Sequence, residues 1–207
     1  WSNSLNVAQM LDKSSYSISL GNTHQDGIIS STGMDRYNVK VSADTKLTNN
    51  WSSGFTANYI TTSIDKAVTS GNGLLRTVYA APPSYDLAGI PSHVDGNQYT
   101  QNSFRGSFDN AYWAMDNNKF TEDTNRFFGN VYASYQTDFG TTNHKLNAKY
   151  MVGVDAYTTH YVDSYGYGSN TGGGRGQIEN YGWTNATYNS LLTINYDWHI
   201  NEDWGLN

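Results

Sequence analysis

Residues 145–156 read KLNAKYMVGVDA, and apolar and polar side chains alternate along almost the whole stretch. The even positions are apolar, with Leu146, Tyr150 and Val154 among them, whereas most odd positions are polar, beginning with Lys145. Successive side chains of a β-strand point to opposite faces of the sheet. This two-residue period therefore predicts a strand with one apolar face and one polar face.

The same alternation recurs along the chain, which predicts an all-β fold. It is found at residues 15–20, 36–47, 51–63, 127–135 and 188–200, and more weakly at residues 3–10. Residues 204–207 look like the opening of a further strand, so we predict seven strands and a truncated eighth. Charged side chains within these strands, such as Lys40, Arg126 and Asp197, lie at polar positions, as the strand assignment requires.

The composition excludes several classes of protein. The 207-residue chain has a formal net charge of -6 and 14% charged residues, where soluble domains carry about 25%. A helical membrane protein is excluded, because no run approaches the roughly 18 to 20 consecutive apolar residues of a spanning helix. A disordered chain is also excluded, because 14% of the residues are aromatic and disordered chains contain few aromatic residues. Singly scattered basic residues argue against a nucleic-acid partner. The absence of Cys excludes disulfides, Cys-based zinc sites and thiol catalysis.

The connections between the predicted strands alternate between brief turns and longer loops, the longest covering residues 64–124. Outer-membrane barrels show this order, with short periplasmic turns and longer extracellular loops. The predicted strands also approach or exceed the about 9 to 11 residues that cross a bilayer. The fold class is therefore an antiparallel up-and-down transmembrane β-barrel, with the apolar positions toward lipid. The alternative is a secreted carbohydrate-binding β-sandwich, whose apolar positions would meet inside the molecule.

Three tryptophans lie beside predicted brief turns, namely Trp51, Trp198 and Trp204. Aromatic rings form belts at the two membrane interfaces of a barrel. We therefore expect these tryptophans to form a membrane girdle in contact with outer-membrane lipid. The polar positions, mostly Asn, Ser, Thr and Gly, would then face the interior of the barrel.

A set of short motifs, met in order over most of residues 10–135, resembles SusC/RagA-type TonB-dependent outer-membrane transporters. The motifs are Ser19-Leu20-Gly21, residues 25–29, residues 36–38, Pro82-Pro83 with Tyr85-Asp86, residues 111–118, Asn125-Arg126-Phe127 and Gly129-Asn130. The later hairpins agree in style only. As a set, the motifs are fairly specific to this family.

The resemblance implies a barrel of about 22 strands closed by a plug, which imports glycans or peptides with energy from TonB. It also implies a SusD-like surface lipoprotein as a lid. Residues 1–207 contain nothing that resembles the plug or the TonB-binding segment. We therefore interpret them as a partial barrel domain of a larger protein, in which TonB acts through the absent plug region. The resemblance implies neither an enzyme nor a cofactor.

The long loop 64–124 is rich in rings and should be ordered. Residues 73–81 are expected to form a short helix that stops at Pro82, because the residue before a proline avoids the α region. Flat rings bury much area while their polar edges stay hydrated. Five rings are therefore predicted to contact the lid or the substrate vestibule; the alternative is that they pack the loop onto the barrel rim. They are Tyr79, Tyr85, Tyr99, Tyr112 and Trp113.

The side chains that could be catalytic groups have simpler interpretations as ordinary strand or loop residues. His24 with Asp26 has the spacing of neighbours in a strand or loop and has no nearby nucleophile in the sequence. Glu122, Asp123 and Glu179 would form a glycosidase pair only if a rigid cleft held two carboxyl groups about 5 to 9.5 Å apart. We predict no catalytic residue and no metal site. A further alternative is a small eight-stranded outer-membrane barrel with an adhesive or structural role.

Overall fold

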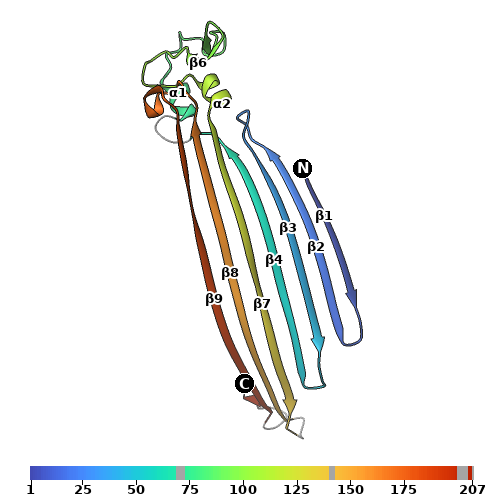
Figure 1. The fold of residues 1–207 in the computed structure, drawn as a ribbon. Coiled ribbons are helices and arrows are strands. Elements are labelled where there is room, and N and C mark those ends of the chain that lie inside the picture. The colour runs from blue at the N-terminus through green and yellow to red at the C-terminus, as the bar shows by residue number, and fades with distance from the viewer. Residues whose placement is uncertain (69–72, 140–142, 200–204, 207) are drawn as a thin grey trace.

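The computed structural model describes residues 1–68, 73–139, 143–199 and 205–206, and one antiparallel sheet dominates it (Figure 1). The sheet has eight strands in the order β1-β2-β3-β4-β7-β8-β9-β10, which is also their order in the chain. Their bounds are β1 Ser2–Met10, β2 Ser14–Asp26, β3 Gly33–Lys46, β4 Trp51–Lys66, β7 Lys119–Asp138, β8 His144–Tyr165, β9 Gln177–His199 and β10 Gly205–Leu206. The all-β prediction is confirmed, and each of the eight predicted strand positions carries a strand of this sheet.

A lobe lies at one end of the sheet, away from the brief turns at 11–13 and 47–50 (Figure 1). The connection 67–118 builds most of it, and the connection 166–176 adds a short turn. Its elements are α1 Leu74–Ala80, β5 His93–Val94, β6 Asn97–Gln101, α2 Ala111–Asn117 and the 3-10 turn η1 Thr171–Gly174. The predicted helix before Pro82 is confirmed as α1, whereas α2 and the β5-β6 hairpin were not predicted.

The long connection is shorter than the predicted 64–124. β4 continues to Lys66, which pairs with Phe120 of β7, so the loop begins at residue 67 and ends at residue 118. The strands continue because backbone hydrogen bonds extend the ladder after the apolar alternation has ended. The same effect lengthens β8, which has 22 residues, and β9, which has 23.

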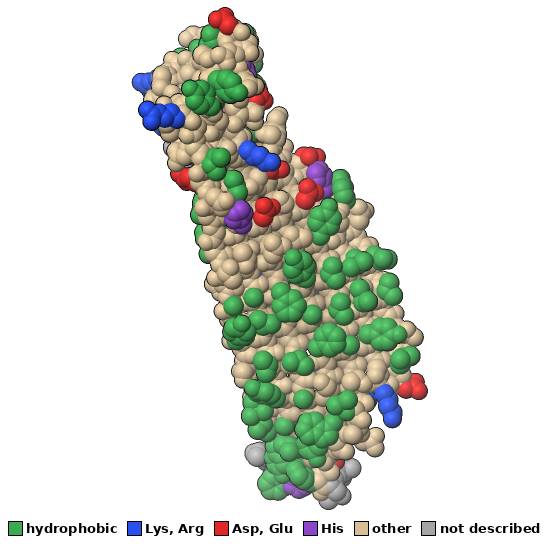
Figure 2. Space-filling view, in the orientation of Figure 1, with side chains coloured by type: hydrophobic (Ala, Val, Ile, Leu, Met, Phe, Trp, Pro, Cys, Tyr) green, Lys and Arg blue, Asp and Glu red, His purple; other side chains and the backbone are tan. Residues whose placement is uncertain are grey.

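The two faces of the sheet differ in chemistry, and we call them the apolar face and the polar face. Figure 2 shows hydrophobic side chains gathered in a broad band over the strands. On this face, for example, Val7 is 60% exposed and Val131 is 54% exposed. Within the described residues, no second large sheet covers this face. One row of directly opposed residues on the apolar face crosses seven strands: Val7, Ile18, Val41, Ala57, Gly129, Val154 and Tyr188.

The polar face carries a contact that crosses three strands. Asp44, Gly54 and Tyr132 are directly opposed on β3, β4 and β7, and the Tyr132 hydroxyl donates to the Asp44 carboxylate at 2.6 Å. A Cβ atom at Gly54 would collide with both partners, so a residue without a side chain is needed between them. The ammonium of Lys149 lies 4.1 Å from the centre of the Tyr132 ring. Side chains of β3, β7 and β8 are thus joined across the backbone of β4.

The buried hydrophobic residues lie in the lobe and at its junction with the sheet. Trp113 of α2 is completely buried. Because α2 contributes most of this cluster, the short helix is held by packing rather than by its own seven residues. The cluster consists of Phe108, Ala111, Trp113, Ala114 and Phe120.

Candidate functional site

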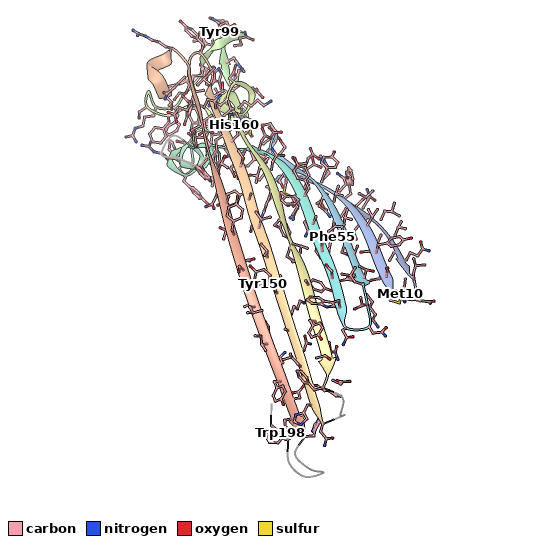
Figure 3. The ribbon with its side chains drawn as sticks, turned by 60° about the horizontal axis from the view of Figure 1, so that its bottom comes forward. Met10, Phe55, Tyr99, Tyr150, His160 and Trp198 are labelled. Atoms are coloured by element: carbon pink, nitrogen blue, oxygen red, sulfur yellow. The ribbon has the colours of Figure 1, made fainter. Side chains whose placement is uncertain are left out.

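An aromatic border runs along the apolar face near the brief turns. Trp51 and Tyr135 are directly opposed, with ring centres 5.0 Å apart, and Trp198 stacks on His144 at 5.6 Å. Figure 3 shows Trp198 close to the turn end of β9. Trp51 is 46% exposed and Trp198 is 38% exposed. Two of the three predicted girdle tryptophans therefore lie on the apolar face at one end of the sheet. Trp204 lies outside the described residues.

A polar row crosses the same face toward the lobe. At the β2 end of this row, the His24 ring and the Asp35 carboxylate lie 2.8 Å apart. Further along the row, the Ser63 hydroxyl donates to the Asp123 carboxylate at 2.6 Å. His160, labelled in Figure 3, lies 2.6 Å from the side-chain oxygen of Asn180. The directly opposed members of this row are His24, Asp35, Ser63, Asp123 and His160.

The surface between the aromatic border and the polar row is here called the apolar band. Along β4 it runs from Trp51 to Ser63, which is twelve steps of the strand. At about 3.3 Å per residue this is roughly 40 Å along the strand, and a tilt of about 40° reduces it to roughly 30 Å across a membrane. The hydrocarbon layer of a bilayer is also about 30 Å thick. The apolar band therefore has the height of a membrane interior.

Two of the carboxylates considered above, Glu122 and Asp123, are not arranged as an acid and base pair. Glu122 lies on the polar face, where it pairs with Lys66 at 3.3 Å, whereas Asp123 points to the opposite face. His24 contacts Asp26 as well as Asp35, and the described part of the chain holds no group of three potential metal ligands.

A buried carboxylate in the lobe joins its two connections. Asp109, 3% exposed, accepts hydrogen bonds from Gln101 at 2.8 Å, from the Ser169 hydroxyl at 2.6 Å, and from the backbone and side chain of Asn170 at 2.7 and 2.8 Å. Its carbonyl oxygen accepts from Thr77 of α1 at 2.9 Å. Hydrogen bonds of this number compensate a buried charge. Asp109 therefore fixes residues 67–118 against residues 166–176.

The five rings predicted in the long loop have different environments. Tyr79 of α1 is 85% exposed, Tyr99 of β6 is 52% exposed and Tyr112 of α2 is 44% exposed. Tyr85 is half-buried, and its ring lies 5.6 Å from that of Phe104.

Trp113 has an exposed fraction of 0%, and its Nε1 donates to the carbonyl oxygen of Gln98 at 2.8 Å. It packs inside the lobe and presents no surface to a ligand or a lid. Asn110 caps α2 by accepting from the backbone nitrogens of Tyr112 and Trp113, which turns Trp113 inward. Trp113 therefore packs within the lobe, whereas Tyr79, Tyr99 and Tyr112 lie at the surface.

A second aromatic group, here called the ring cluster, lies on the polar face at the lobe end of β8 and β9. It consists of Tyr161, Tyr181 and Trp183. The rings of Tyr161 and Tyr181 are stacked at 5.0 Å, and Trp183 lies 5.2 Å from Tyr161. Sequence reasoning missed it, although all three residues occupy polar positions of their strands, where rings are not needed for a lipid contact.

Two tyrosines of the ring cluster keep their protons at neutral pH. The hydrogen bond to Asp163 and partial burial raise the pKa of Tyr181. Partial burial and the nearby Glu122 raise the pKa of Tyr161. Both residues lie beyond the end of the apolar band, and both hydroxyls are protonated donors.

Comparison with known proteins adds no family: no protein-family model matches the chain, and no curated protein matches it. Within the described residues, no helix is both long enough and apolar enough to span a membrane. The functional argument therefore depends on the geometry of the apolar band, the lobe and the polar face.

Proposed function

We propose that this chain is part of the barrel wall of a SusC/RagA-type TonB-dependent transporter in the outer membrane of a Gram-negative cell. In this role it imports large polar nutrients, glycans or peptides, and it performs no chemistry on them and needs no cofactor. The observation that carries the proposal is the apolar band, which is continuous across the strands, uncovered, and about as high as a bilayer interior.

The free energy of hydration favours this environment over water. Burying a Val, Leu, Ile or Phe side chain contributes about 1.5 to 3 kcal/mol, and the apolar band leaves many of them about half exposed. Phe55, for example, is 43% exposed and Ile194 is 60% exposed. An apolar solvent removes this cost without a second protein layer. The sandwich alternative needs such a layer over the same residues.

The two edges of the sheet support a larger barrel. Within the described residues, β1 pairs only with β2, and the outer edge of β9 pairs with β10 only at Trp198 and His199. Unpaired strand edges are not tolerated in the hydrocarbon layer. Further strands of the same barrel would satisfy both edges. The small eight-stranded alternative needs β1 to pair directly with the strand that begins at β10.

The polar face and the lobe fit the remaining parts of the proposal. The polar face would line the lumen, where Arg126 pairs with Asp155 through two hydrogen bonds of 2.8 and 2.5 Å. The lobe would stand over the extracellular mouth. Its exposed rings, Tyr79, Tyr99 and Tyr112, would contact a SusD-like lid or the substrate, while TonB would act through a plug outside residues 1–207.

Single cysteines test the orientation of the sheet, since the natural chain has none. Val131→Cys and Ile194→Cys place a spin label on the apolar face; their neighbours, Asn130→Cys and Thr193→Cys, place it on the polar face. In lipid vesicles, the first pair should be relaxed by oxygen, which dissolves in hydrocarbon, and the second pair by a water-soluble nickel complex. Water accessibility at all four positions would refute the membrane orientation.

The lid contact needs a separate measurement. A Tyr79→Ala and Tyr112→Ala double variant should lower co-purification of a surface lipoprotein and uptake of the nutrient. A Tyr85→Phe variant keeps its half-buried ring and serves as the control. Unchanged association and uptake in a correctly folded double variant would reject the contact while leaving the membrane orientation intact.

A further inference from the structure

The ring cluster lies among carboxylates on the polar face. Tyr161 is directly opposed to Tyr181, and two residues nearer the lobe Asp163 is directly opposed to Glu179. These side chains and Trp183 have the same parity on β8 and β9, so they share one face. The cluster is therefore a mixed aromatic and acidic surface near the end of the strands where the lobe begins.

One half of this surface already holds an ammonium group. The Nζ atom of Lys66 lies 4.3 Å from the centre of the Tyr161 ring and 3.3 Å from a carboxylate oxygen of Glu122. A ring face attracts a cation through its quadrupole, and a carboxylate adds a charged partner. Tyr161 and Glu122 thus form a binding site for a primary amine within the protein itself.

The other half of this surface also combines a tyrosine ring with carboxylates, but among the described residues no cation is paired with those carboxylates. The Tyr181 hydroxyl donates to Asp163 at 3.1 Å, and among the described residues neither Asp163 nor Glu179 forms an ion pair. Two like charges directly opposed across a strand pair are destabilising. Tyr181 is 44% exposed and Trp183 is 52% exposed, so ring surface is available beside the carboxylates.

We propose that Tyr181, Trp183, Asp163 and Glu179 bind a cationic group of the transported ligand, namely the ammonium of a lysine or the guanidinium of an arginine in a peptide. This proposal rests on the proposed function, because the polar face must line the import path. It selects basic peptides over glycans, since the two carboxylates repel each other until a cation lies between them, and a neutral sugar does not remove this repulsion. The negative net charge of -6 also favours the approach of a basic ligand.

Calorimetric titration of the detergent-purified protein tests this site. The probes are an N-acetylated trilysine amide, the same peptide with its three side-chain amines acetylated, and maltotriose. The free trilysine should bind, and acetylation of its amines should weaken binding about tenfold or more, since the cation–π and charged contacts are lost together. Maltotriose should not compete with trilysine. Equal binding of both peptides, or carbohydrate binding that displaces the peptide, would overturn the proposal.

Variants locate the effect in the chain. The Asp163→Asn and Glu179→Gln double variant keeps side-chain size and should weaken trilysine binding about tenfold. Asp197→Asn removes one carboxylate from the same face of β9, close to the turn end, and should leave the affinity unchanged. Trp183→Leu should weaken binding several-fold. Equal losses in the double variant and in Asp197→Asn would show that only net charge matters and would reject the site.

The proposed function has its own readout in this design. Spin-label accessibility in the same wild-type preparation reports whether the sheet lies in a membrane. A lipid-facing apolar band without selective trilysine binding rejects the cation site alone. Water accessibility of the apolar band rejects the transporter, and the import role of the cation site with it.

Discussion

The eight-stranded sheet and the lobe treat hydrophobic side chains in opposite ways. In the lobe, Trp113 is 0% and Phe108 is 6% exposed, whereas in the sheet Val131 is 54% and Leu192 is 61% exposed. Exposed apolar surface costs free energy in water but not in hydrocarbon. The lobe therefore has a hydrophobic core of its own, whereas the sheet has one apolar and one polar surface, as the proposed membrane location requires. The lobe and the sheet differ in where their hydrophobic side chains point: into a core in the lobe, and outward from one face in the sheet.

The largest expected effect is in the lobe. Trp113→Ala should lower the free energy of unfolding of the lobe by about 3 to 5 kcal/mol, because it leaves a cavity and removes the bond to Gln98. Hydrogen exchange of the backbone amides in residues 97–118 measures this loss. Tyr112→Ala, on the exposed side of the same helix, should cost less than about 1 kcal/mol. Equal effects would mean that the lobe has no core of its own.

The next effect should appear only in lipid. Val131→Arg places a charge inside the apolar band and should destabilise the folded protein in vesicles by about 2 to 4 kcal/mol. Urea unfolding followed by tryptophan fluorescence gives this difference. Asn130→Arg, one position away on the polar face, should change stability by no more than about 0.5 kcal/mol. If the two variants behaved alike, the contrast between the faces would have no energetic meaning.

A smaller effect is expected on the polar face. Tyr132→Phe keeps the ring over Gly54 but removes the hydrogen bond to Asp44, and should cost about 0.5 to 1.5 kcal/mol. The same urea titration is sensitive enough to detect it. Tyr79→Phe removes a hydroxyl from a ring that is 85% exposed and is the matched control. A Tyr132→Phe variant as stable as the control would show that the contact across three strands contributes nothing.

The strands could be predicted because their signal is local. Alternation over residues 145–156 identifies β8, yet β8 runs to Tyr165. Beyond Ala156 both parities become polar, as at Thr158 and Thr159, because the strand leaves the apolar band. Its continuation depends on backbone pairing with β7 and β9, which a periodicity cannot report.

The candidate sites were harder to predict. The five loop rings look alike in sequence, but Trp113 is buried and Tyr79 is exposed. The difference arises from the cap at Asn110 and from the contacts around Asp109, whose partners lie up to 61 residues away in the chain. The ring cluster and the ion pair beside it were missed because Lys66, Glu122, Tyr161 and Tyr181 come from four different strands.

By itself, the amino-acid sequence determined that the chain forms two-faced strands, where they lie, and that one face is apolar, because the period of a strand is local and exact to one residue. Only the tertiary structure decided that these faces join into one uncovered band, that Trp113 belongs to a core, and that rings and carboxylates meet beside Lys66. The physical reason is that burial and ion pairing depend on which distant residues become neighbours, and this follows from strand register and loop packing rather than from spacing along the chain.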